Sequence, residues 1–217
     1  MSLSLPVDAA LFDHAAMDLL AEAIADPGYG IFPDFLVPSL GRDLIGLVRD
    51  KIADDELKRA GIGKGIAAKV RSEIRTDSIF WLNSEDAAPT TGIWLKAMDA
   101  LCAHFRAALF LPVWSYEGHL ASYPPAGFYK PHLDQHQSSL ARQVSIITYL
   151  NKDWNESDGG QLRLFTESRD GPYIDVIPQL GTAVIFRSAD FWHEVLPAKQ
   201  TRLSLTGWLR GRDEVPV

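Results

Sequence analysis

Three potential metal ligands recur at every second position in the stretch Lys130–His136, which reads KPHLDQH. They are His132, Asp134 and His136. Alternate side chains of a β-strand point to one face, so an imidazole and a carboxylate two residues apart can bind one divalent ion. Three such ligands would span about 13 Å of a straight strand, too far for one ion held at about 2.0–2.2 Å. At most two of them bind the same metal, and another strand must supply a further ligand.

The residue that best meets this need is His193. His14 and His104 lie in helical patterns, and His119 has no partner motif around it. Two histidines and one carboxylate on one face of an ion form the facial triad of non-heme Fe(II) oxygenases, which leaves positions for a 2-oxo acid and O₂. The His-Glu pair at 193–194 does not form a zinc-protease helix, because Pro197 stands where the second histidine would be needed.

An arginine follows His193 by nine residues, at Arg202, in the otherwise apolar run RLSLTGW. A guanidinium at an inward strand position is costly without an anionic partner. Its planar fork fits a carboxylate through two parallel hydrogen bonds. Arg202 is therefore predicted to bind the second carboxylate of a 2-oxo diacid.

The composition is that of a single soluble domain with room for a core. The chain has 217 residues, 47% hydrophobic and 23% charged. Its net charge of −7 argues against binding to nucleic acid. Cys102 is the only cysteine, which excludes an intrachain disulfide and a thiolate zinc site. Because no apolar run approaches the length of a membrane span and the start lacks a signal-peptide pattern, we expect a cytoplasmic protein without membrane contact.

The first half of the chain is predicted to be mainly helical. Ser39 is expected to cap the second of three amphipathic helices, and the run YGIFPDFLV (29–37) is expected to be a strand. The run GIGKGIAAK (61–69) is predicted to be a mobile loop, because it lacks the Gly-Lys-Ser/Thr ending of a phosphate-binding loop. The three helices are expected at 9–26, 39–60 and 91–110.

From about Trp114 the pattern changes to short β-rich runs bounded by Gly, Pro, Asn or Asp. Eight such runs at fairly regular spacing favour a jelly roll of two sheets, with the three helices covering one sheet. The expected fold class is therefore α+β, mainly β. The runs are SYEGHLASY, YKPHLD, QVSIITYL, GQLRLF, YIDVI, TAVIF, HEVLP and RLSLTGWL.

From about Glu73 to Arg210 the sequence resembles the 2-oxoglutarate- and Fe(II)-dependent prolyl hydroxylases, in the branch of the animal oxygen-sensing enzymes and their bacterial relatives. The resemblance implies a double-stranded β-helix (jelly roll) in one oxygenase domain, residues 1–217. Helical support and a substrate-cover hairpin would occupy 1–112, and the β-helix core 113–211. It implies Fe(II), 2-oxoglutarate and O₂, with ascorbate in a supporting role. The segments that carry it are EIRTDSIFWL, ASYPPAGFYKPHLD, YLNKDW, DGGQLRLF and HEVLPAKQTRLSLTGW.

The resemblance also implies a role for each matching position. The iron ligands would be His132, Asp134 and His193. Arg202 and Tyr149 would bind the far carboxylate of 2-oxoglutarate, Tyr123 would lie beside the co-substrate and metal, and Thr206 and Trp208 would line the pocket. The stretch YPPAGFYKPH is one residue shorter between tyrosine and first ligand than in the animal enzymes, so the role of Tyr129 stays open.

The implied substrate is a protein with an accessible proline loop. Arg75, Asp77 and Arg142 are the candidates for contacting it, and elongation factor Tu, the target of some bacterial members, is the leading specific target. Two other interpretations remain: a related oxygenase acting on a small molecule or free amino acid, and a cupin-like binding module without activity. A groove wide enough for a peptide favours the first, and a small closed cavity favours the second. Arg202 argues against the third, because a pure binder needs no anchor for an oxo acid.

Overall fold

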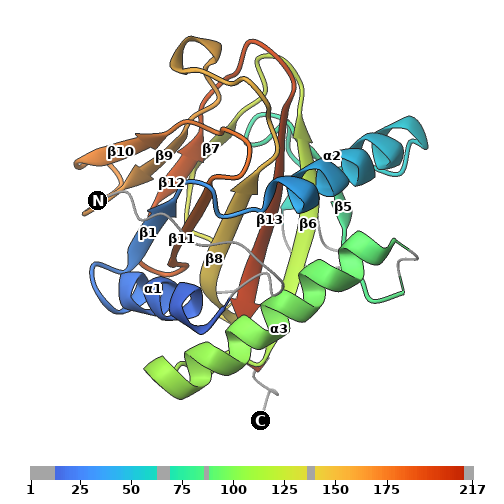
Figure 1. The fold of residues 1–217 in the computed structure, drawn as a ribbon. Coiled ribbons are helices and arrows are strands. Elements are labelled where there is room, and N and C mark those ends of the chain that lie inside the picture. The colour runs from blue at the N-terminus through green and yellow to red at the C-terminus, as the bar shows by residue number, and fades with distance from the viewer. Residues whose placement is uncertain (1–12, 63–68, 86–87, 136–139, 213–217) are drawn as a thin grey trace.

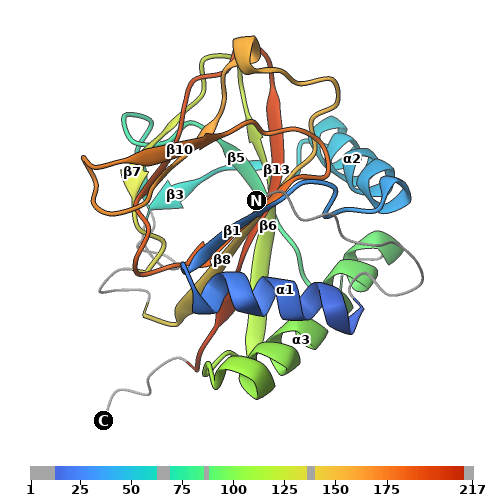
Figure 2. The same ribbon diagram turned by 60° about the vertical axis from the view of Figure 1, so that its left-hand side comes forward.

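The computed structural model describes residues 13–62, 69–85, 88–135 and 140–212. Two antiparallel β-sheets face each other, and the described α-helices lie against the outer side of the larger sheet (Figures 1 and 2). The predicted fold class, a mainly β jelly roll with helical support, is confirmed. Among the helices in the described ranges, none combines the length and apolarity that crossing a membrane requires.

The larger sheet supplies one long wall of the molecule. Along β13, Leu205 and Leu209 belong to the core beneath the helices, whereas Thr206 and Trp208 face the opposite sheet. This alternation follows from the two-residue period of a strand. In spatial order, its strands are β1 (Tyr29–Phe32), β11 (Ala183–Arg187), β8 (Arg142–Tyr149), β13 (Arg202–Arg210), β6 (Ser115–Tyr123), β5 (Ser78–Trp81) and β2 (Lys58–Arg59).

The smaller sheet brings two of the predicted metal ligands together. In the pairing of β12 with β7, His193 lies directly opposite His132. Its strands, in spatial order, are β10 (Tyr173–Val176), β9 (Leu162–Phe165), β12 (His193–Val195) and β7 (Tyr129–His132). β3 (Gly61–Ile62) and β4 (Lys69–Val70) pair antiparallel in a separate two-stranded sheet, and the 3₁₀-helix η2 spans Glu156–Asp158.

Two apolar clusters hold the layers in place. One packs the helices against the outer face of the larger sheet, and Trp94, Met98 and Phe105 of α3 are fully buried in it. The other fills part of the space between the sheets, where Ile147 and Leu162 meet from opposite walls. Because apolar groups fix both faces of the larger sheet, its inward polar side chains are held on a rigid support.

The helices are α1 (His14–Ala25), α2 (Pro38–Ala53) and α3 (Pro89–Leu109). Asp13 caps α1, since its side chain accepts a hydrogen bond from the backbone N–H of Ala16 at 2.8 Å. The helix predicted at 91–110 begins two residues early, because Pro89 suits the first turn. Residues 9–12 of the first predicted helix lie outside the described residues.

Three local predictions were wrong. Ser39 does not cap α2; Val37 is the N-cap and Pro38 occupies the first turn. That helix does not reach residue 60, because Asp55 adopts a left-handed conformation (φ 57°) soon after Ala53. The strand predicted at 29–37 ends at Phe32, before a proline, which lacks a ladder donor. Residues 63–68, in the predicted loop 61–69, lie outside the described residues.

Candidate metal centre and its pocket

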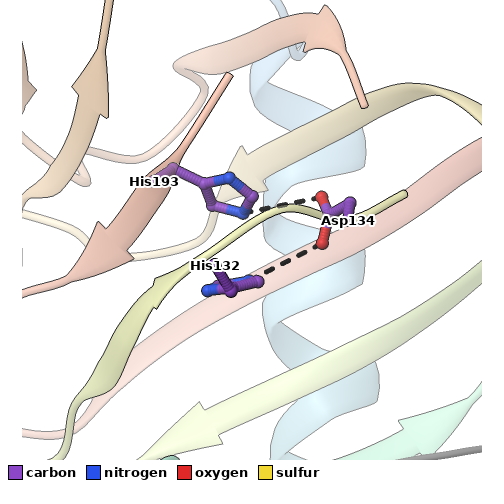
Figure 3. Close-up of side chains that lie close together, drawn as sticks. All are labelled: His132, Asp134 and His193. Atoms are coloured by element: carbon purple, nitrogen blue, oxygen red, sulfur yellow. Dashed lines mark ion pairs between the residues drawn. The ribbon is translucent and has the colours of Figure 1, made fainter. Parts of the chain in front are cut away.

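His132, Asp134 and His193 form a compact cluster between the two sheets (Figure 3). His132 ends β7, Asp134 follows two residues later, and His193 begins β12. One ligand atom from each side chain lies within 4.8 Å of those of the other two. The Nε2 atoms of His132 and His193 lie 3.6 and 3.5 Å from the Asp134 oxygens Oδ1 and Oδ2. His136 lies outside the described residues.

The backbone fixes the orientation of both imidazoles. His132 Nδ1 lies 2.8 Å from the carbonyl oxygen of Lys130, and His193 Nδ1 lies 3.1 Å from that of Phe191. A carbonyl oxygen only accepts hydrogen bonds, so each Nδ1 carries the proton and donates it. In a neutral ring held this way, the unprotonated nitrogen is Nε2, which faces Asp134. This is the tautomer that a metal-binding histidine needs.

The electrostatics of the cluster favour a neutral histidine beside an ionised aspartate. Burial, together with the neighbouring His132, lowers the pKa of His193 to about 4. Burial alone would raise the pKa of Asp134, but His193, His132 and a hydrogen bond from Ser145 together hold it well below its usual value. The cluster thus offers a neutral His193 imidazole and an ionised Asp134 carboxylate near neutral pH, with the His132 ring beside them.

The cluster opens into a cavity of about 360 Å³ between the sheets. The three ligands line it, as do Arg202 and Arg210 at the two ends of β13. Tyr123, Thr206 and Trp208 also line the cavity, whereas Tyr149 lies behind Arg202 and is not part of its lining. The inward side chains of β13 thus follow the cavity along the whole strand.

Unpaired donors gather at the Arg202 end of this cavity. Arg202 is only 1% exposed, and its Nε donates to the Gly160 carbonyl at 2.8 Å. Within the described ranges, Arg202 Nη2 and the Tyr149 hydroxyl are buried without a hydrogen-bond partner. The guanidinium carbon lies 5.1 Å from the centre of the Tyr149 ring and 5.2 Å from that of Tyr123. Buried, unpaired donors around one cation mark a site for an anion.

Comparison with known proteins decides the family. Residues 118–210 match the model of the 2OG-Fe(II) oxygenase superfamily. A crystal structure of a Pseudomonas putida prolyl-4-hydroxylase has a TM-score of 0.80 and 38% identity, covering 91% of this chain and all of that one. The chain belongs to the 2OG-Fe(II) oxygenase superfamily.

Two animal relatives support this assignment over most of the chain. Human Egl nine homolog 1 is 30% identical over 92% of this oxygenase chain and 47% of its own length, and human prolyl hydroxylase EGLN3 is 24% identical over 93% and 86%. This oxygenase chain spans about half the length of the Egl nine homologues it matches. A Trichoplax adhaerens prolyl hydroxylase, solved with a hypoxia-inducible-factor peptide, shares the fold with a TM-score of 0.79 at 22% identity, covering 89% of this chain and 88% of that one.

The site of this oxygenase fits the cofactors of the superfamily. Two imidazoles and a carboxylate are the donor set that suits Fe(II). The unpaired donors of Arg202 and Tyr149 suit the far carboxylate of 2-oxoglutarate. Burial raises the pKa of Tyr149 despite the opposing charge of Arg202, so its hydroxyl keeps its proton and can donate it.

The predicted substrate residues Arg75 and Asp77 form a buried pair beside the metal ligands. Both Asp77 oxygens accept from Arg75, at 2.8 and 2.5 Å, and Asp77 is only 1% exposed. The guanidinium of Arg75 lies 4.4 Å above the Tyr129 ring, which stacks on His132 with the ring centres 3.6 Å apart. Arg75 lines the cavity and Asp77 does not. Tyr129, whose role the sequence left open, thus lies between Arg75 and a metal ligand.

A row of flat side chains lines the outer part of the cavity. Arg142, Trp208, His119 and Trp81 come from four neighbouring strands, β8, β13, β6 and β5. Arg142 lies 3.4 Å above the Trp208 ring, and His119 stacks on Trp208 at an interplanar angle of 12°. Trp81 packs against both rings, with its centre 5.0 Å from that of His119 and 6.2 Å from that of Trp208.

Sequence reasoning did not select several of these residues. Glu117 also lines the cavity and pairs with Arg142 at 2.8 Å and with Arg210 at 3.1 Å. The signal was present in the alternation of β6, because Glu117 and His119 share the face of Tyr123, which was selected. Trp81 gave no such signal, since it lies on a short strand that the sequence did not reveal as one.

Proposed function

We propose that the protein hydroxylates a prolyl residue of a protein substrate in a 2-oxoglutarate- and Fe(II)-dependent reaction. The carrying observation is the length of the cavity. Arg202 and Arg210 both line it and are eight residues apart on one strand, or about 26 Å at about 3.3 Å per residue. A five-carbon diacid beside Arg202 fills only one end of such a space. The outer part, with Arg142 and Trp208, is left for groups that flank the reacting carbon, as a polypeptide supplies and a free amino acid does not.

At the inner end, the residues hold the reacting groups. His132, Asp134 and His193 would bind Fe(II), which together with 2-oxoglutarate supplies the oxidation: one atom of O₂ enters the substrate C–H bond and the other enters succinate as CO₂ is released. Arg202 and Tyr149 orient the co-substrate by its far carboxylate. The inward side chains Ile147, Leu162 and Val195 keep this part of the cavity apolar and limit access of water.

Beside the co-substrate, Tyr123 and Thr206 complete the inner wall. Burial raises the pKa of Tyr123, so its hydroxyl stays protonated and serves as a donor. Thr206 lines the cavity two residues before Trp208, in the same inward row of β13. In this proposal, Tyr123 and Thr206 hold the co-substrate in place, and Trp208 separates it from the outer part of the cavity.

Arg75, beside the metal ligands, and Arg142, at the outer end, are proposed to contact the substrate. Both line the cavity and carry guanidinium groups that can donate to the carbonyl oxygens of an extended peptide. Asp77 acts through Arg75, since both of its oxygens are occupied by that side chain. Asp77 therefore sets the position of Arg75 without contacting the peptide itself.

More specifically, we propose that the target is a proline loop of elongation factor Tu. Because that protein acts in the cytoplasm, the enzyme would be located there too. Two findings support it. The sequence resembles the bacterial branch in which this target occurs, and the chain is 38% identical to the Pseudomonas putida prolyl-4-hydroxylase over nearly its whole length.

Succinate formation tests the proposed reaction. The protein would be incubated with Fe(II), 2-oxoglutarate and one of four additions: purified elongation factor Tu, an unfolded proline peptide, the same peptide with alanine in place of proline, or free proline. The proposal predicts that a proline-containing polypeptide stimulates succinate release and the alanine peptide does not. Stimulation by free proline alone would assign a small-molecule oxygenase, and no succinate under any condition would indicate a binding module.

A further inference from the structure

A chain of two buried hydroxyl groups ends on the carboxylate of Asp134. Ser145 Oγ lies 2.7 Å from Asp134 Oδ2, and Ser188 Oγ lies 2.8 Å from Ser145 Oγ. Both serines are 0% exposed, and Asp134 is 5% exposed. Ser145 belongs to β8 of the larger sheet, and Ser188 follows β11 next to it. A hydrogen bond from Ser145 thus joins the larger sheet to a candidate metal ligand on the opposite side of the cavity.

The direction of this chain follows from the charge of Asp134. An ionised carboxylate only accepts hydrogen bonds, so the Ser145 hydroxyl donates to it. A hydroxyl has one proton, so Ser188 must in turn donate to Ser145. The hydrogen bond between Ser145 and an ionised acceptor is of the stronger, charge-assisted kind. Each hydroxyl therefore has one defined orientation, and the second stabilises that of the first.

Ser188 also holds the main chain next to the ligand. Its carbonyl oxygen accepts from the N–H of Gln135 at 3.0 Å, and its own N–H donates to the Gln143 carbonyl at 3.0 Å. The Gln135 side chain donates to the carbonyl oxygens of Leu140 and Arg142, at 2.8 and 2.7 Å. The segment that carries Asp134 is therefore tied to β8 and β11 at its backbone as well as at its carboxylate.

We propose that Ser145, supported by Ser188, is a positioning residue that holds the Asp134 carboxylate ready for the metal. Asp134 lies beyond the end of β7, so no β-ladder fixes its side chain. The hydroxyl chain replaces that support and limits rotation of the carboxylate about its Cβ–Cγ bond. Because a ligand fixed before binding loses less freedom on binding, the chain raises the affinity for the metal. This inference rests on the metal centre of the proposed function.

A Co(II) titration of the metal-free full-length protein tests the inference without relying on turnover. Ser145→Ala removes the donor to Asp134 and is expected to weaken Co(II) binding about 10- to 100-fold. It should also change the visible absorption of bound Co(II), which reports ligand geometry. Ser145→Thr restores the hydroxyl and is expected to recover most of the affinity. Ser188→Ala leaves Ser145 in place and should cause a smaller loss than Ser145→Ala.

Thr148→Val is the matched control. Thr148 is also fully buried on β8, but it lies on the helix side, and within the described ranges its hydroxyl has no hydrogen-bond partner. Its replacement should leave Co(II) affinity and spectrum unchanged, and the melting temperature of each metal-free variant reports its folding. If Ser145→Ala binds Co(II) with unchanged affinity and spectrum, the inference is wrong and the metal centre stands. If the unaltered protein does not bind Co(II), the metal centre and the inference both fail.

Discussion

Replacing Arg202 by lysine tests the proposed co-substrate anchor with the charge kept. The arginine is buried, its Nε is held by the Gly160 carbonyl, and its Nη2 has no partner within the described residues. A lysine places one ammonium group in this space, so it cannot bind the Gly160 carbonyl and present a planar pair of donors to a carboxylate as well. The substitution therefore removes at least one hydrogen bond between charged groups.

The expected size of the effect follows from that loss. A hydrogen bond to a charged group contributes about 1.5–3 kcal/mol, which corresponds to about a 10- to 150-fold change in affinity. We expect the KM for 2-oxoglutarate to rise by this factor, with a smaller change in the KM for the peptide substrate. The assay is succinate release at saturating peptide over a range of 2-oxoglutarate concentrations.

Arg163→Lys provides the matched control for this substitution. Arg163 pairs with Asp175 on the smaller sheet and does not line the cavity. Its replacement should leave the KM for 2-oxoglutarate unchanged. If Arg202→Lys also leaves this KM unchanged, another residue holds the far carboxylate and the proposed anchor is wrong.

Three further predictions concern the metal, the cover and the pH dependence. Asp134→Ala is expected to abolish Fe(II)-dependent succinate release while circular dichroism shows the fold intact; full activity would refute the ligand assignment. Asp77→Asn weakens the hold on Arg75 and should lower peptide hydroxylation about ten-fold, with little change in peptide-independent succinate release; equal loss of both would assign Asp77 to the fold or the metal site. Burial, with the positive charge of Arg75, lowers the pKa of His119 from 6.5 to about 4. The folded state therefore binds this proton more weakly than the unfolded state. The contribution of a neutral His119 to the free energy of unfolding is fully present above pH 6.5 and is lost as the pH falls toward 4. Urea unfolding of the metal-free protein should show this loss, and His119→Phe should reduce it; an unchanged pH dependence would show that His119 does not titrate in this way.

The sequence predicted the strands of the second half and the metal ligands because their signals are local. His132 and Asp134 are two residues apart on one strand, and a polar residue such as Arg202 is conspicuous in an apolar run. The alternation of β6 and β13 was strong enough to place the whole strand in each case. The family resemblance then supplied expected roles for residues such as Tyr149, which spacing alone does not suggest.

What the sequence did not reveal depends on contacts between distant segments. Ser145 looks like an ordinary strand residue until β8 is placed opposite Asp134. The partners of Glu117 lie 25 and 93 positions away, at Arg142 and Arg210, and only the strand order brings them together. β2 has two residues and is stabilised as a strand by pairing with β5. No local sequence pattern predicts this pairing.

The most direct test of the central claim is a search for hydroxylated prolyl residues in cellular proteins. Proteins from cells that express the unaltered enzyme would be compared by mass spectrometry with those from cells that express only Asp134→Ala. We expect at least one prolyl residue, with elongation factor Tu as the leading protein, to carry an added oxygen atom only when the unaltered enzyme is present. If no prolyl residue differed between the two samples while a hydroxylated small molecule accumulated only with the active enzyme, the protein would not be a prolyl hydroxylase of proteins.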